Sequence, residues 1–128
     1  MRKKNMDDSV EGWMSSNVAT ARLDETLSAA QKRMNDGDFR ALPVVEQGRL
    51  IGIITDRDLR SHSEHPERAT VESAMSELPT TVTPATPLRE AARFLFELKI
   101  GALPVVKDGR LVGVITTQDV LRAFLKQD

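Results

Sequence analysis

Residues 41–55 read A-L-P-V-V-E-Q-G-R-L-I-G-I-I-T, and residues 102–116 read A-L-P-V-V-K-D-G-R-L-V-G-V-I-T. The two stretches lie 61 positions apart, and at that offset Val10–Arg60 aligns with Val71–Leu121 without a gap. A period near 60 is longer than the roughly 20–50 residues of common solenoid repeats. A half of about 60 residues would have only a marginal core by itself. We therefore expect two half-domains related by an approximate twofold axis.

The composition is that of a globular protein. Of the 128 residues, 40% are hydrophobic and 29% are charged, which excludes a disordered chain. The formal net charge of −1 leaves no basic excess for a phosphate backbone, so no nucleic-acid partner is expected. No apolar run approaches the roughly 18 residues that span a bilayer, so no membrane segment is expected either. The chain has no cysteine, which excludes disulfides and favours a cytoplasmic location.

The spacing of apolar residues predicts the same elements in each repeat: a short extended piece, a helix, two strands and a closing helix. The inward faces of the two first helices are predicted to consist of Leu27, Ala30 and Met34 in the first repeat and of Leu88, Ala91, Ala92 and Leu95 in the second. The first of these helices is predicted to open at Asp24 or Glu25. The second is predicted to begin at Pro87 with Thr86 as its cap. Asp108-Gly109 predicts a hairpin turn between the strands.

These elements and motifs resemble the CBS domain, named after cystathionine β-synthase, which usually occurs in tandem as a Bateman module. The motifs that carry the resemblance are L-P-V-V, a hairpin and G-x-x-T-x-x-D, twice in one register over about residues 9–126. The resemblance implies an α/β (α+β) fold of two pseudo-twofold-related β-α-β-β-α repeats packed into one compact module. We expect an N-terminal tail at 1–8, the first repeat with its linker at 9–65 and the second repeat at 66–128.

The repeated T-x-x-D, Thr55 to Asp58 and Thr116 to Asp119, has a purely structural interpretation. Each threonine follows a predicted strand and precedes a predicted helix. In a capping box the threonine oxygen accepts from the third helical N–H, and the acid at that position reaches back to the cap. Such a cap stabilises a helix by about 0.5–2 kcal/mol and requires no ligand.

Three features favour a ligand site as well. Gly52 and Gly113 each lie three residues before the threonine, inside β-branched strands, where glycine indicates close approach by another backbone or by a ligand. The N–H groups of a helix start favour a phosphate, to which the threonine hydroxyl can add. The aspartate one turn along can accept from the paired hydroxyls of a ribose, as acids do in dinucleotide folds.

Phosphate, ribose and an apolar slot for a base describe a nucleoside phosphate. The resemblance implies the same class, since CBS pairs commonly bind AMP, ADP or ATP, and sometimes NAD or S-adenosylmethionine, in clefts between the repeats. It also implies that the base lies against the extended piece and the segment leading into L-P-V-V. The first nucleotide site is then predicted to contain Thr20, Ala21, Arg40, Ala41, Leu42, Pro43, Gly52, Thr55, Arg57 and Asp58. The second is predicted to contain Thr81, Val82, Gly101, Ala102, Leu103, Pro104, Gly113, Thr116, Gln118 and Asp119.

The two sites differ after the threonine. The first has Asp56 and Arg57, whereas the second has Thr117 and Gln118. An acid at the first helical position repels phosphate, although Arg57 can compensate or reach toward the other ligand. We therefore expect the second site to hold a monophosphate more simply.

Catalytic and metal-binding signals are weak. No G-x-x-x-x-G-K-[ST] occurs, and no histidine lies within a repeat to activate a serine or threonine. His62 and His65 in the linker lack a third clear metal ligand. We expect no enzyme activity, no metal and no required cofactor. The function predicted is that of a regulatory module that senses an adenosine nucleotide through a conformational or dimer change; the alternative is a ligand-free structural or dimerisation module whose T-x-x-D motifs only cap helices.

The first helices of the two repeats differ in polarity. Phe94, Phe96 and Leu98 in the second repeat correspond to Arg33, Asn35 and Gly37 in the first. The apolar arc of the second helix spans roughly 200°, which is wide for one buried face. We expect a homodimer that uses Phe94, Phe96 and Leu98; the alternative is a thicker core on that side. The resemblance further implies that the module regulates an attached or associated enzyme or transporter.

Overall fold

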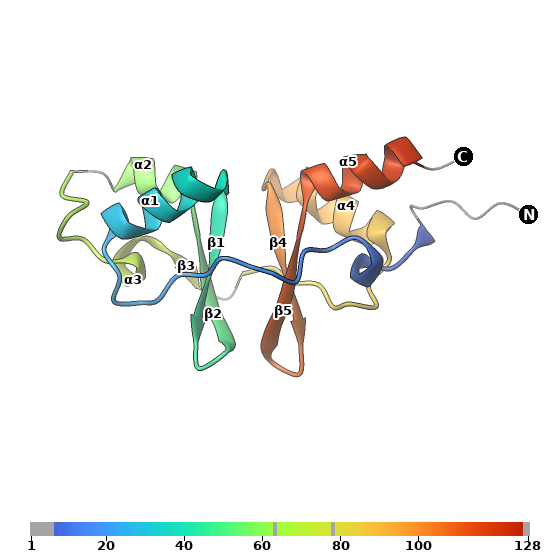
Figure 1. The fold of residues 1–128 in the computed structure, drawn as a ribbon, viewed down its shortest axis with the longest axis horizontal. Helices are drawn as coiled ribbons and strands as arrows, with labels where there is room; N and C mark the ends of the chain where they lie inside the picture. The colour runs from blue at the N-terminus through green and yellow to red at the C-terminus, as the bar shows by residue number, and fades with distance from the viewer. Residues whose placement is uncertain (1–6, 63, 78, 127–128) are drawn as a thin grey trace, which may run out of the picture. The chain divides into compact units, whose positions relative to one another are not determined.

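The computed structural model describes residues 7–62, 64–77 and 79–126. Its elements, in chain order, are η2 (Val10–Gly12), α1 (Leu27–Gly37), β1 (Ala41–Glu46), β2 (Arg49–Thr55), α2 (Asp56–Ser61), α3 (Val71–Ala74), β3 (Ser76–Glu77), α4 (Leu88–Leu98), β4 (Ala102–Lys107), β5 (Arg110–Thr116) and α5 (Thr117–Lys126) (Figure 1). The fold is α+β with antiparallel strand pairs, as the sequence predicted. The chain divides into two compact units, each described by itself. The first-repeat unit is Ala19–Pro79, and the second-repeat unit combines Met1–Val18 with Thr80–Asp128.

In the first-repeat unit, the β1–β2 hairpin carries α1 and α2 on one side (Figure 1). The hairpin register pairs Ala41 with Thr55, so the start of L-P-V-V lies beside the end of β2. The extended piece before α1 joins β1 through a parallel bridge between Ala21 and Val44. The apolar positions predicted to face inward on α1 are all buried: Leu27, Ala30 and Met34. They pack against buried residues of the hairpin, including Leu42 and Ile54.

The second-repeat unit repeats this arrangement with β4, β5, α4 and α5. Ala102 pairs with Thr116, and Val82 bridges to Val105 in parallel. Of the inward positions predicted on α4, three are buried, namely Leu88, Ala91 and Leu95, and Ala92 is half-buried. Their contacts with buried β4 and β5 side chains form the core of this unit.

Both hairpins turn through two residues in the left-handed region of φ. The values are 53° and 80° at Gln47 and Gly48, and 54° and 79° at Asp108 and Gly109. Positive φ at both central residues is the geometry of the two-residue turns that match strand twist. The hairpin predicted at Asp108-Gly109 is therefore confirmed.

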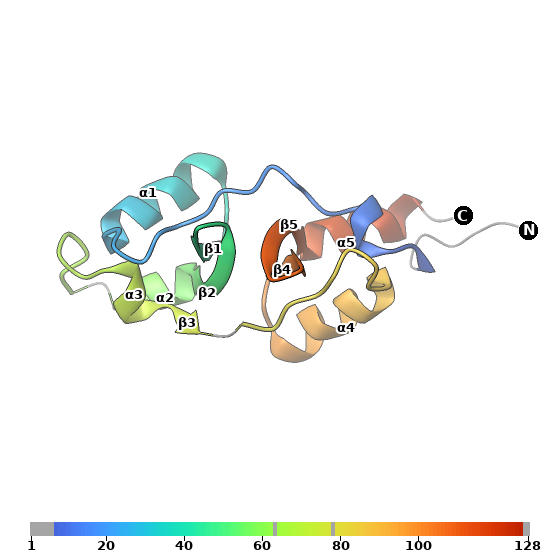
Figure 2. The ribbon, with the colours of Figure 1, turned by 90° about the horizontal axis from the view of Figure 1, so that it is seen from below.

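The short segment that opens each repeat packs in the other repeat's unit. Val10 N donates to the Thr86 carbonyl at 2.8 Å, and Val71 N donates to the Glu25 carbonyl at 2.8 Å, the equivalent bond. Figures 1 and 2 show η2 in the unit of α4 and α5, and α3–β3 in the unit of β1 and β2. The compact units therefore cut across the boundaries between sequence repeats.

The two predicted helix starts are wrong by one to three residues. Helix α1 begins at Leu27, and its cap is Thr26, whose side chain accepts from Ala29 N at 3.1 Å. Thr86 does not cap α4, because its hydroxyl accepts from Thr83 N at 2.9 Å and Pro87 is the residue before the helix. In both repeats the side chain at this position, Glu25 or Thr86, accepts a backbone N–H in the turn that leads into the helix.

Candidate functional site

Both T-x-x-D motifs form capping boxes. Thr55 Oγ1 accepts from Asp58 N at 3.1 Å, and Asp58 Oδ2 accepts from Thr55 N at 2.9 Å. Thr116 and Asp119 make the same two bonds at 3.1 and 2.9 Å, and the Thr116 hydroxyl also donates to Asp119 Oδ2 at 2.9 Å. The structural interpretation of the motif is therefore realised in full. A carboxylate has about four lone-pair positions, so the box does not exhaust either aspartate.

In the second-repeat unit the other oxygen of Asp119 faces an arginine. Arg122 Nη2 lies 3.3 Å from Asp119 Oδ1, and it also donates to the Trp13 carbonyl at 3.2 Å. The same guanidinium lies over the Trp13 ring, 5.5 Å from its centroid. The first repeat has Ser61 at the position of Arg122. The two candidate sites therefore differ in the charge beside the aspartate.

Within each unit, the predicted site segments converge on the strand end that carries the threonine. Asp56 N donates to the Arg40 carbonyl at 3.0 Å, and Thr117 N donates to the Gly101 carbonyl at 3.1 Å. The extended pieces pair instead with β1 and β4, the other strand of each hairpin, since Ala21 N donates to the Pro43 carbonyl at 2.9 Å. The equivalent bond from Val82 N in the second unit is 3.1 Å long.

Gly52 and Gly113 have an explanation that needs no ligand. A Cβ on Gly52 would lie 2.7 Å from Met75 Sδ and 2.8 Å from the Ser76 carbonyl oxygen. A Cβ on Gly113 would meet Met14 Sδ and the Ser15 carbonyl oxygen at the same distances. The sequence allowed two explanations for these glycines, close approach by another backbone or by a ligand. The structure shows close approach by the backbone of the opening segments. These glycines therefore give no support for a ligand.

The acid after Thr55 is less repulsive to an anion than its sequence position implies. Asp56 Oδ2 lies 3.6 Å from Arg40 Nη1 and 3.4 Å from Arg60 Nη1. Arg57 is exposed beside it. This end of the first-repeat unit thus carries two carboxylates, Asp56 and Asp58, of which Asp56 is paired with two arginines.

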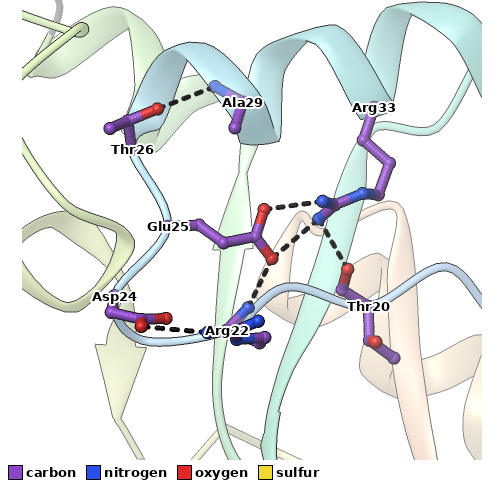
Figure 3. A network of polar contacts seen from close by, with 7 residues as sticks. All are labelled: Thr20, Arg22, Asp24, Glu25, Thr26, Ala29 and Arg33. Atoms are coloured by element: carbon purple, nitrogen blue, oxygen red, sulfur yellow. Dashed lines mark hydrogen bonds and ion pairs between the residues drawn. The ribbon is translucent and has the colours of Figure 1, made fainter.

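An ion pair that the sequence analysis missed lies behind the extended piece of the first-repeat unit (Figure 3). Arg33 binds Glu25 in a bidentate manner, with Nη1 to Oε1 at 3.1 Å and Nη2 to Oε2 at 2.6 Å. Arg33 Nη1 also donates to the Thr20 carbonyl at 2.8 Å, and Glu25 Oε1 accepts from Arg22 N at 2.8 Å. Burial acts to raise the pKa of Glu25, but the hydrogen bonds from Arg33 and Arg22 and their charges outweigh it, so the pKa is lowered.

Two negative findings apply to the residues that the structure describes. No group of three or more His, Asp or Glu side chains in them is arranged to hold a metal ion. No helix in this part of the chain has the length and apolar character needed to cross a bilayer.

Comparison with known proteins now identifies the family. The CBS domain model matches residues 10–65 and 71–126, which are the two repeats. The chain belongs to the CBS domain family. A CBS domain-containing protein of Dictyostelium discoideum is 37% identical over 132 residues, which cover 91% of each chain.

Two solved CBS structures resemble this one and carry adenosine compounds. CBSX2 in complex with AMP has a TM-score of 0.86 and 28% identity, covering 93% of this chain and 97% of its own. The CBS domain pair of protein MJ0100, in complex with 5′-methylthioadenosine and S-adenosyl-L-methionine, has a TM-score of 0.83 and 29% identity, covering 91% and 98%.

CBS pairs also occur within enzymes. The inosine-5′-monophosphate dehydrogenase of Halobacterium salinarum is 34% identical over 107 residues, which are 82% of this chain but 21% of the enzyme. The similarity to that enzyme covers only a CBS-like part of it, whereas both repeats of the present chain are CBS domains.

Proposed function

We propose that this CBS pair is a regulatory module that binds an adenosine nucleotide, with AMP, ADP or ATP as its ligand. The observation that carries the proposal is the arrangement repeated in each unit, in which a strand ends at a capped helix start with its aspartate and the neighbouring strand of the hairpin pairs with an extended segment. The AMP complex of CBSX2, a protein of the same fold, supports the choice of adenosine compounds.

The threonines and aspartates have assigned roles in this proposal. Asp58 and Asp119 accept from ribose hydroxyls with the lone pairs that the capping box leaves. Thr55 and Thr116 lie beside the phosphate, where backbone N–H groups at the helix start favour an anion. The Thr55 hydroxyl can add a donor there, whereas the Thr116 hydroxyl already donates to Asp119 Oδ2. Thr20 and Ala21, and Thr81 and Val82, face the base with the segments that lead into L-P-V-V.

The two sites are proposed to differ at the phosphate end. The first site gathers Arg40, Arg57 and Arg60 around Asp56, so its charge depends on how these arginines rearrange when an anion arrives. The second site has the uncharged Thr117 and Gln118 at the same positions. We expect the second site to accept a monophosphate with less rearrangement.

A homodimer is part of the proposal. Phe96 and Leu98 on α4 are 83% and 46% exposed, and α5 in the same unit exposes Leu121, Phe124 and Leu125. Among the described residues of the first-repeat unit, Phe39 is the only large hydrophobic side chain counted as exposed. Several large apolar side chains exposed on two helices of one unit favour an interaction surface. We define the α4–α5 apolar surface as Phe96, Leu98, Leu121, Phe124 and Leu125 and assign it to self-association. Phe94, the third residue predicted for the dimer interface, is half-buried and packs against the core of the unit.

A thermal-shift panel of AMP, ADP, ATP, NAD and S-adenosylmethionine tests the proposal. A ligand present at 100 times its Kd stabilises the folded state by about 2.7 kcal/mol, which is readily detected. Asp58→Ala and Asp119→Ala serve as matched variants, one for each site. We expect at least one AMP, ADP or ATP shift that a matched variant reduces.

The competing function is a ligand-free structural module, which the two complete capping boxes favour. It predicts no shift with any compound of the panel. It also predicts that each aspartate variant lowers stability equally with and without nucleotide.

A further inference from the structure

The extended piece of the first-repeat unit is held at three consecutive residues, 20–22. Its middle residue, Ala21, pairs with β1 on both sides, through Ala21 N to the Pro43 carbonyl at 2.9 Å and Val45 N to the Ala21 carbonyl at 3.1 Å. The groups on either side of it are held by the Glu25–Arg33 pair. Without that pair, the strand pairing of Ala21 and the turn contacts of Arg22, namely Glu25 N to the Arg22 carbonyl at 3.3 Å and Arg22 Nη2 to Asp24 at 3.0 Å, would remain, and the Thr20 carbonyl would lose its bond to Arg33.

The geometry of the Glu25–Arg33 pair fixes the position of the Thr20 carbonyl. Arg33 offers its planar fork to both oxygens of Glu25 and uses one of the same nitrogens for the Thr20 carbonyl. Bidentate charge-assisted bonds of this kind fix geometry as well as contributing energy. The Glu25 side chain is 15% exposed and that of Arg33 37%, so salt screens the pair less than it screens a surface pair. Figure 3 shows the Thr20 carbonyl directed at Arg33, with the Thr20 side chain pointing the other way.

The second repeat lacks the arginine. Phe94 occupies the position of Arg33, and a phenyl ring cannot donate a hydrogen bond to the Thr81 carbonyl. The turn itself is kept, because Thr86 Oγ1 accepts from Thr83 N at 2.9 Å where Glu25 accepts from Arg22 N. The two extended pieces therefore share a strand pairing and a turn. They differ at their first residue, because Arg33 binds the Thr20 carbonyl and Phe94 cannot bind the Thr81 carbonyl.

We infer that Glu25 and Arg33 are positioning residues of the first nucleotide site alone. The inference rests on the proposed function, since Thr20 and Ala21 belong to the adenosine site assigned above. A ligand that meets a segment already fixed in place does not lose binding free energy in ordering it. The pair therefore makes binding at the first site depend on a charged contact that no ligand atom touches, whereas the second site relies on apolar packing at the same place.

The test uses Arg33→Met, with Lys32→Met as the matched control. Lys32 is on the same helix and forms an exposed pair with Asp36 at 2.9 Å, so its replacement removes the same charge without touching residues 20–22. AMP binding is measured by calorimetry in an Asp119→Ala background, which leaves the first site, and in an Asp58→Ala background, which leaves the second. Amide hydrogen exchange at Arg22 is measured in the ligand-free protein.

We expect Arg33→Met to raise the Kd for AMP at the first site about 5-fold or more, to speed exchange at the Arg22 amide and to leave the second site unchanged. Arg33→Lys, which keeps the charge but not the fork, should fall between wild type and Arg33→Met. Lys32→Met should match wild type in every measurement.

An unchanged Kd at the first site overturns the inference even if Arg22 exchange is faster, and so does an equal loss at both sites, which indicates general destabilisation. Failure of the unmutated protein to bind any of AMP, ADP and ATP at either site is a different result. It overturns the proposed function and the ligand-positioning role together, and the exchange measurement then reports only on the structural effect of the pair.

Discussion

Thr55 and Asp58, like Thr116 and Asp119, close a capping box, and in the proposed function the same groups also contact a nucleotide. The capping task can be measured without any ligand. Asp58→Ala should lower the free energy of unfolding by about 1 kcal/mol, the usual effect of losing a helix cap. Urea denaturation measures it, with Arg57→Ala as the control, since Arg57 is exposed and lies between the box residues. A loss for Arg57→Ala as large as that for Asp58→Ala would contradict the assignment.

The Glu25 carboxylate gives a pH-dependent prediction. Its pKa is lowered from an ordinary value of 4.5: burial acts to raise it, and the contacts with Arg33 and Arg22 prevail. The ionised form therefore stabilises the folded state fully above pH about 4.5, and this stabilisation is lost as the pH falls through the lower folded-state pKa. Glu25→Gln removes that titration.

The difference in free energy of unfolding between wild type and Glu25→Gln should thus be largest near pH 7 and shrink as the pH is lowered below 4.5. Urea titrations at pH 7, 4.5 and 3 measure it. A difference that stays constant over this range would show that the carboxylate is not held by its arginines.

At the scale of elements, the close packing of each opening segment on a strand depends on a glycine in that strand, Gly52 in β2 or Gly113 in β5. An alanine at Gly52 would place its Cβ 2.8 Å from the Ser76 carbonyl oxygen, which belongs to backbone and cannot rotate away. Overpacking of this kind costs about 1–3 kcal/mol. Gly52→Ala should destabilise by that amount in urea and increase amide exchange in β3. Gly101→Ala is the control, because nothing lies within 4 Å of a Cβ there, and an equal loss in the control would contradict this account.

The elements most fully predicted were those governed by local chemistry. The hairpins followed from β-branched runs around a left-handed turn, and the inward faces of α1 and α4 followed from helical spacing. Helix starts were less accurate, because several neighbouring polar residues suit a cap. The contacts of Glu25 with Arg33 and Arg22 take it out of that role and leave Thr26 as the cap of α1, and in the second repeat Thr86 accepts from Thr83 N instead.

Two features could not be predicted: the packing of each repeat's opening segment in the other repeat's unit, and the Glu25–Arg33 pair. Two repeats with the same apolar pattern allow each opening segment to pack on either core, so the pattern alone does not choose. The one sequence signal for the ion pair was a basic residue, Arg33, where the other repeat has Phe94. The nucleotide-site residues stay a prediction; the structure shows that Arg40 and Gly101 bond to the first residue after each threonine, Asp56 and Thr117.

At the scale of the whole molecule, the α4–α5 apolar surface predicts self-association. Phe96 is the most exposed of its large side chains, so Phe96→Asp places a charge on the surface without disturbing a buried contact. We expect light scattering to give the mass of a dimer for wild type at micromolar concentration and that of a monomer for Phe96→Asp. A wild-type monomer would contradict self-association through this surface.

The central claim is that the two T-x-x-D strand ends are adenosine sites as well as helix caps. The most direct measurement is an AMP titration followed by the backbone amide signals of the isotope-labelled protein. We expect saturable shifts at Thr20, Ala21 and Thr55–Asp58, at Thr81, Val82 and Thr116–Asp119, or at one of these two groups. Saturable shifts confined to other residues, or no shifts with AMP, ADP or ATP at millimolar concentration, would contradict the claim and leave the motifs as helix caps alone.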